Sequence, residues 1–122
     1  MTMSGEHDPL AEAQSNAQRM AIHAEQSLGT VEWDEALSHV QEALRYGEMA
    51  RAFIEEAIDS TADERVILHG ERALESIEEA LDQASQALFA SEATVRRHTE
   101  LMSAHADRGL SQLSQATGRQ AA

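Results

Sequence analysis

A seven-residue repeat runs through the middle of this chain, from residue 33 to residue 88. Its unit is a polar residue, then alanine, then leucine or isoleucine, as in Glu35-Ala36-Leu37, Glu42-Ala43-Leu44 and Glu79-Ala80-Leu81. Seven residues make close to two turns of α-helix, so the repeat keeps these alanines and leucines on one side of each helix. Such a face has to be covered by another helix. The repeat therefore predicts an all-α bundle.

The composition agrees with a single all-α domain spanning residues 1–122. The chain contains four aromatic residues, and its one proline is Pro9, so helix interiors are uninterrupted and strands are not expected. The length suits one hydrophobic core. Because there is no cysteine, disulfides, thiolate metal sites and thiol nucleophiles are excluded.

The net charge of −13 at pH 7 limits the partners that we expect. It repels the phosphates of nucleic acid and of anionic membranes, whereas metal cations and basic proteins suit it. The chain has no apolar run of about 20 residues and no signal-peptide pattern at its start. These features predict a soluble protein with no membrane partner, cytoplasmic as written or periplasmic if a signal peptide was removed.

Local signals place the first two helices. Asp8 followed by Pro9 is a strong helix start, with aspartate as the N-cap and proline in the first turn. Apolar residues then recur at three-four spacing up to Gly29, which supplies a C-terminal cap. Thr30 can cap the next helix. We expect helices at about 9–28 and 31–59.

Two further signals place the second pair of helices. Thr61 with Glu64 three residues later forms a capping box for a third helix, and Ser91 is the best N-cap for a fourth. We expect helices at about 62–89 and 92–116, and an antiparallel up-down-up-down four-helix bundle. An unbroken helix from the third through to Ala116 is the alternative, and it would need a partner chain to cover it.

Alanine at an inward position in nearly every heptad lets the helix axes approach closely. The core is then thin, with little room for a large cofactor, and no haem attachment motif is present. Neither haem nor a nucleotide cofactor is expected.

Five of the six histidines share one heptad position. When core residues such as Ala17, Val40, Ile77 and Thr99 are assigned to position a, position g holds His23, His39, His69, His98 and His105. A g residue lies at the edge of a helix interface, half covered, where its ring can reach a neighbouring helix. The ordinary explanation is a semi-exposed histidine that hydrogen bonds to a glutamate.

Counting about 1.5 Å per residue from each turn puts three of these histidines at one depth in the bundle. His23, His39 and His98 are expected to share a layer. His69 and His105 would approach each other toward the opposite end.

Neutral imidazoles with carboxylates close by suit Cu(II), Ni(II) or Zn(II). The predicted site joins His39 to His23 or His98, with Glu35 or Glu42 completing the shell. The expected function is therefore non-enzymatic binding of divalent transition metal ions.

Two stretches resemble a known family: Gly29 to Ala50, in which His39, Ala43, Leu44 and Tyr46 follow heptad spacing, and Ser76-Ile77-Glu78-Glu79-Ala80-Leu81-Asp82-Gln83. They look like the bacterial small metal-binding protein family, periplasmic helical bundles with histidine in most heptads. The resemblance covers about residues 29–90 and implies a metal-binding bundle.

The chain departs from that family at several g positions. Tyr46 and Phe53 follow His39 where histidine would be repeated, and Ser76 and Gln83 follow His69 in the same way. Of the family's histidines, only His39 and His69 carry over. High-capacity metal loading does not follow from the resemblance.

Other classes of function remain. An acidic adaptor or scaffold could bind a basic protein or self-associate, using Tyr46 and Phe53 as an aromatic strip. The segment from Ala104 to Ser111 resembles a histidine phosphotransfer motif, although the negative charge of Asp107 opposes a phosphoryl group beside His105. A di-iron site needs glutamate three residues before histidine, and no such pair occurs.

Overall fold

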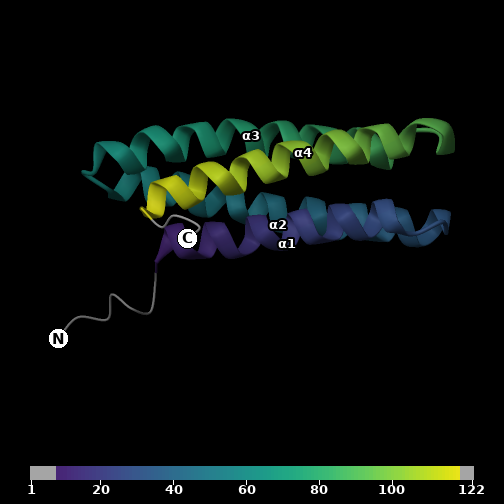
Figure 1. Cartoon of the computed structure of the whole chain (residues 1–122), viewed down its shortest axis with the longest axis horizontal. Helices are drawn as coiled ribbons and strands as arrows, with labels where there is room; N and C mark the ends of the chain where they lie inside the picture. Colours follow the sequence, from purple (N-terminus) through teal and green to yellow (C-terminus); the bar gives the residue numbers. More distant parts are fainter. Residues whose placement is uncertain (1–7, 119–122) are drawn as a thin grey trace.

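The computed structural model describes residues 8–118, and within them the chain folds into four α-helices with no strand (Figure 1). The helices are α1 (Pro9–Gly29), α2 (Trp33–Ser60), α3 (Glu64–Leu88) and α4 (Glu92–Thr117). The expected all-α four-helix bundle is confirmed for this part of the chain. His7 and the tail at 119–122 lie outside the described residues.

The helices pack as two hairpins. Figure 1 shows α1 and α2 along one long side of the bundle and α3 and α4 along the other, and α2–α3 and α1–α4 contacts join the sides. In the second hairpin His69 pairs with Gln112, and His98 pairs with Gln83. The later residue of α3 thus contacts the earlier residue of α4, so these two helices run in opposite directions.

The two hairpins bury equivalent positions. Ala13, Ala17 and Ala24 of α1 are fully buried, and so are Ala73, Ile77 and Ala84 of α3, each 60 residues later. The same holds for α2 and α4 at a spacing of 59, where Val40, Ala43 and Ala57 correspond to Thr99, Met102 and Ala116. The buried positions of the first hairpin thus have counterparts in the second.

Alanine dominates the core, and glycine lets the helices approach still closer. A Cβ atom on Gly47 would lie 2.7 Å from Cδ2 of Leu81 and 2.8 Å from Sδ of Met20. The larger side chains that are completely buried include Met20, Ile54, Ile77 and Met102. This packing agrees with the thin core predicted from the repeat.

The leucines of the repeat are less buried than we expected. Leu81 is buried, but Leu44 and Leu74 are only partly buried and pack against the edge of the core. In each unit alanine takes position d and leucine takes position e. Because alanine brings the two backbones close, the e residue lies beside the interface and remains partly exposed to solvent.

The helix starts follow the sequence signals only in part. Oδ1 of Asp8 accepts hydrogen bonds from the amides of Leu10 and Ala11, which confirms the first N-cap. The break near Ser91 is also confirmed, so the unbroken-helix alternative is excluded. The hydroxyl of Ser91 makes no capping bond to the backbone and instead pairs with the hydroxyl of Thr94.

The predicted capping box is wrong. The N-cap of α3 is Asp63, whose carboxylate accepts from the Arg65 amide at 2.9 Å, while the Thr61 hydroxyl accepts from the Asp63 amide at 3.1 Å. Thr30 likewise accepts from the Glu32 amide inside the turn, so α2 and α3 each begin two residues later than expected.

The end of α1 also differs from the expectation. Gly29 is its last residue and makes no left-handed cap, because among the described residues only Gly118 has a positive φ. The C-cap is Thr30 in extended backbone conformation.

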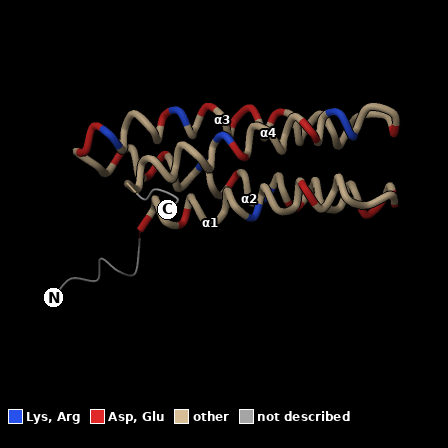
Figure 2. The backbone as a smooth tube through the Cα atoms, in the orientation of Figure 1, with Lys and Arg blue, Asp and Glu red and all other residues tan. Residues whose placement is uncertain are grey.

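Acidic residues recur along α3 and are sparse along α1 (Figure 2). None of the four described helices combines the length and the hydrophobicity that a membrane-spanning segment requires.

Candidate functional site

The heptad register predicted for the histidines is confirmed. Ala17, Val40, Ile77 and Thr99, the residues assigned to position a, are all buried. The five histidines at position g are neither buried nor fully exposed, as expected for the edge of a helix interface: His23, His39, His69, His98 and His105. The side chains that each histidine contacts show which of them could form a site.

Two of these histidines face each other across the first hairpin. Nδ1 of His23 on α1 and Nδ1 of His39 on α2 lie 3.1 Å apart, and the ring centroids are separated by 5.3 Å. This is the distance of an N–H···N hydrogen bond, in which one ring donates and the other accepts. The accepting ring must be neutral. The pairing of His39 with His23 was predicted from sequence, and the structure brings the two rings together.

An aromatic ring supports this pair. Tyr46, one heptad after His39, stacks on His23 with ring centroids 5.6 Å apart and an angle of 7° between the planes. The guanidinium groups of Arg45 and Arg19 lie 4.7 Å and 5.7 Å from the Tyr46 centroid, within range of cation–π attraction. The sequence did not indicate that Tyr46 would contact His23. Tyr46 is partly buried, and it holds the His23 ring in place.

The electrostatics favour a neutral His23. Burial lowers the pKa of His23, the positive charge of His39 lowers it further, and Glu42 opposes these effects in part. A hydrogen bond of 2.9 Å from Arg45 lowers the pKa of Glu42, so this carboxylate is ionised at neutral pH. The lowered pKa therefore favours an unprotonated His23 at pH 7, with the ionised Glu42 close enough to influence it.

The other three histidines do not join this pair. Nδ1 of His98 donates to Oε1 of Gln83 at 2.8 Å, so His98 faces α3 rather than α1 or α2. His98 therefore does not converge with His39, although the depth estimate correctly brought His23 and His39 together. A residue at position g of α4 faces α3, the other helix of the second hairpin.

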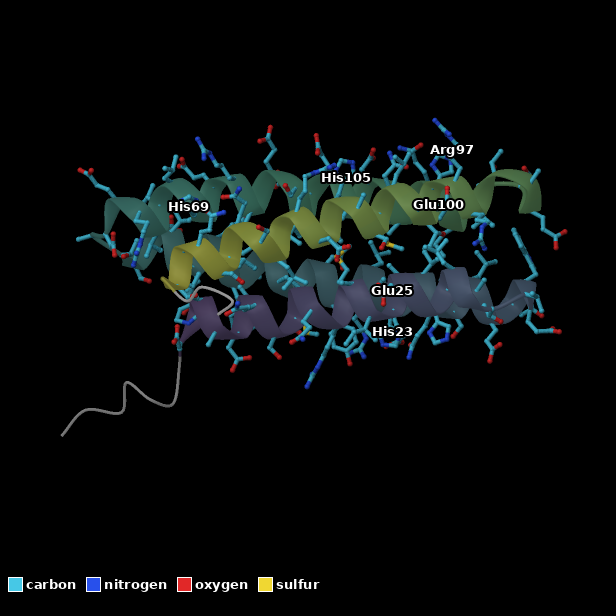
Figure 3. The ribbon with its side chains drawn as sticks, viewed as in Figure 1. His23, Glu25, His69, Arg97, Glu100 and His105 are labelled. Carbon is cyan, nitrogen blue, oxygen red and sulfur yellow. The ribbon has the colours of Figure 1, made fainter. Side chains whose placement is uncertain are left out.

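His69 and His105 also remain apart. His69 donates to Oε1 of Gln112, which follows His105 by one heptad, or about 10 Å along the helix. Nδ1 of His105 accepts a hydrogen bond of 2.6 Å from the guanidinium of Arg108 on its own helix and lies 3.2 Å from Oε1 of Glu79. Figure 3 shows His105 and His23 on opposite sides of the bundle.

The two predicted carboxylates differ in their availability. Oε1 of Glu35 accepts a hydrogen bond of 2.8 Å from the Thr30 hydroxyl and so belongs to the turn between α1 and α2. Glu42 lies close enough to influence the pKa of His23. Within residues 8–118 no three histidine, aspartate or glutamate side chains are grouped closely enough to hold a metal ion. The site thus consists of two imidazoles with a carboxylate farther away.

The second hairpin contains the same contact with one residue changed. His23 corresponds to Gln83, 60 residues later, and His39 corresponds to His98, 59 residues later. The His23–His39 contact of 3.1 Å and the Gln83–His98 contact of 2.8 Å are therefore equivalent. We call these the first-hairpin pair and the second-hairpin pair. This correspondence was not visible in the sequence, because the core residues of the two halves differ.

Comparison of the chain with models of known protein families, with curated protein sequences and with solved structures found no match.

Proposed function

We propose that this chain is a non-enzymatic helical-bundle protein that binds a divalent transition metal ion, Cu(II), Ni(II) or Zn(II), through His23 and His39. The observation that supports this proposal is the separation of 3.1 Å between their Nδ1 atoms. Glu42 is the nearby carboxylate, and the net charge of −13 draws cations toward the protein.

The nitrogen separation matches that of two neighbouring ligands on one metal ion. With metal–nitrogen bonds of about 2.0 to 2.1 Å, two ligands lie about 2.8 to 3.0 Å apart at 90° and about 3.3 to 3.4 Å apart at the tetrahedral angle. The observed distance falls between these ranges, so either geometry becomes possible when the rings rotate to direct both Nδ1 atoms at one metal ion. The metal ion would replace the proton that the two nitrogens share.

The lowered pKa of His23 also favours binding at neutral pH. A metal ion competes with protons for the imidazole nitrogen, and a lower pKa reduces that competition. Binding should weaken as the pH falls through about 6.5, where an ordinary imidazole becomes protonated.

Calorimetric titration and thermal melting with micromolar Cu(II), Ni(II) and Zn(II) at about pH 7.5 test the proposal. Metal should raise the melting temperature of the wild-type protein, because it binds the folded state. His39→Ala should abolish most of this shift. His98→Ala is the matched control, because it removes the counterpart histidine from the second-hairpin pair and should leave the shift intact.

The proposal fails if none of the three metals gives a shift that depends on His39. Equal losses in His39→Ala and His98→Ala would also count against it, because they would point to diffuse attraction by the acidic surface rather than to the first-hairpin pair.

One observation favours an adaptor as the second candidate. Val31 and Phe89, in the turns after α1 and α3, have 98% and 91% of their surface exposed. The two turns lie at the same end of the bundle (Figure 1), beside a cavity of about 290 Å³ lined in part by Leu28, Trp33 and Val95. Exposed apolar residues around a hollow are typical of protein contacts. Val31→Ser with Phe89→Ser should then remove partners that the wild-type chain captures.

A further inference from the structure

We propose that the first-hairpin pair is half of a metal site and that a second copy of this chain completes it. The inference rests on the proposed metal binding and adds a partner to it. The metal ion would join two copies through four imidazoles, His23 and His39 from each.

The first reason is that one copy offers too few ligands. Zn(II), Cu(II) and Ni(II) take four or more donors in stable protein sites. The first-hairpin pair supplies two, and no group of three candidate ligands exists in the described part of the chain. A second identical pair brings the number to four without any other side chain.

The second reason is that the pair is accessible from outside. His23 and His39 occupy the edge of the α1–α2 interface and are only half covered, and α3 and α4 lie on the other side of the bundle. Figure 3 shows His23 on the outer side of α1, away from α3 and α4. A second copy can therefore approach the pair without opening the bundle.

The third reason is the charge of this face. On the α2 side of this face Glu42 forms an ion pair with Arg45, and from Ser15 to Ala24 Arg19 is the single charged residue of α1, in a chain with 22 acidic residues. Ile22, next to His23, is 45% exposed and offers an apolar contact. Two copies that meet here avoid most of the repulsion that their net charges would cause elsewhere, and Arg19 can approach carboxylates of the other copy.

The arrangement also suits two-fold symmetry. In a symmetric dimer each copy uses the same surface, so one pair of histidines meets the identical pair across the axis. A metal ion on that axis receives two nitrogens from each copy. The stoichiometry is then one metal ion for two chains.

Sedimentation and light scattering of the full chain with Zn(II) alone test this inference, with calorimetry giving the stoichiometry. Zinc should convert a species of 13.3 kDa into one of twice that mass, with half a zinc ion bound per chain. A chelator should reverse the change. His39→Ala should stay monomeric with zinc, and His98→Ala should dimerise like the wild type.

Ile22→Glu separates the inference from the proposed function. The substitution adds a negative charge on the exposed face and leaves both histidines in place. It should prevent the doubling of mass, while the remaining zinc binding still depends on His39. If the wild-type protein binds one zinc ion per chain, depends on His39 for this binding and stays at 13.3 kDa, the shared site between two copies is wrong, whereas metal binding by the first-hairpin pair is supported. If zinc produces no His39-dependent binding at all, both are wrong.

Discussion

The substitution Gln83→His should give this protein a second metal site. Gln83 is the counterpart of His23, and its side chain already contacts His98, the counterpart of His39, at 2.8 Å. The substitution therefore rebuilds the first-hairpin pair on the opposite side of the bundle. Position 83 is only half covered, so the added ring can be accommodated at the edge of the α3–α4 interface.

The size of the effect follows from linkage. A ligand at 100 times its dissociation constant stabilises the folded state by about 2.7 kcal/mol per site. For a chain of 122 residues the entropy of unfolding is about 0.26 kcal/mol per kelvin, so one site raises the melting temperature by about 10 °C. Two equal sites should give about twice that shift, and the number of metal ions bound per chain should double.

Thermal melting followed by circular dichroism, with and without Zn(II), measures the shift, and calorimetry measures the stoichiometry. Gln86→His is the matched control, because Gln86 is an exposed residue of α3 that hydrogen bonds to Asp82 on its own helix. The reasoning is refuted if Gln83→His binds no more metal than the wild type while His39→Ala still abolishes the wild-type site. An equal gain from Gln86→His would show that position within the interface is irrelevant.

Three further predictions concern stability and the support of the site. Ile54→Ala should lower the free energy of unfolding, measured in urea, by about 2 to 4 kcal/mol, because Ile54 is fully buried. Leu44→Ala should lower it less, because Leu44 remains partly exposed. Equal losses in the two variants would contradict the assigned core. Partial desolvation and the negative charge of Glu25 raise the pKa of the exposed Asp107, so its charged form disfavours the folded state above that pKa and the penalty disappears as the pH falls below it. Asp107→Asn should therefore raise the melting temperature slightly at about pH 7 and leave it unchanged at about pH 3. Tyr46→Ala should weaken metal binding several-fold in calorimetry, because the ring that stacks on His23 is lost. Tyr46→Phe keeps the ring and should bind metal like the wild type. Weaker binding by the phenylalanine variant would assign the role to the hydroxyl instead.

Much of the fold could be predicted because a heptad pattern specifies which side of a helix is buried. It placed Val40 and Thr99 correctly in the core, and the N-cap signal at Ser91 located the break before α4 without a glycine or proline. It overestimated the burial of Leu44, because the alanine before it draws the helices together and leaves the leucine beside the interface. The N-cap of α3 was missed because Thr61 and Asp63 both offer side-chain acceptors within one short turn.

The candidate site could be predicted only in part, for a geometrical reason. Residue counting gives the depth of a side chain along the bundle, and this brought His23 and His39 together correctly. Depth does not say which neighbouring helix a g residue faces, because that depends on the order of the helices around the bundle axis. His98 was therefore assigned to the wrong partner, and it contacts Gln83 instead.

The near-equivalence of the two hairpins has a consequence for how the halves recognise each other. Counterpart positions carry side chains of different volume, with Ala21 in α1 where α3 has Leu81. Leu81 and Met20 fill the space above Gly47. A bundle assembled from two first hairpins would present Ala21 in place of Leu81 and leave a void at that glycine. The first hairpin is therefore shaped to pack against the second hairpin rather than against a copy of itself, and the connection at residues 61–63 keeps the two together.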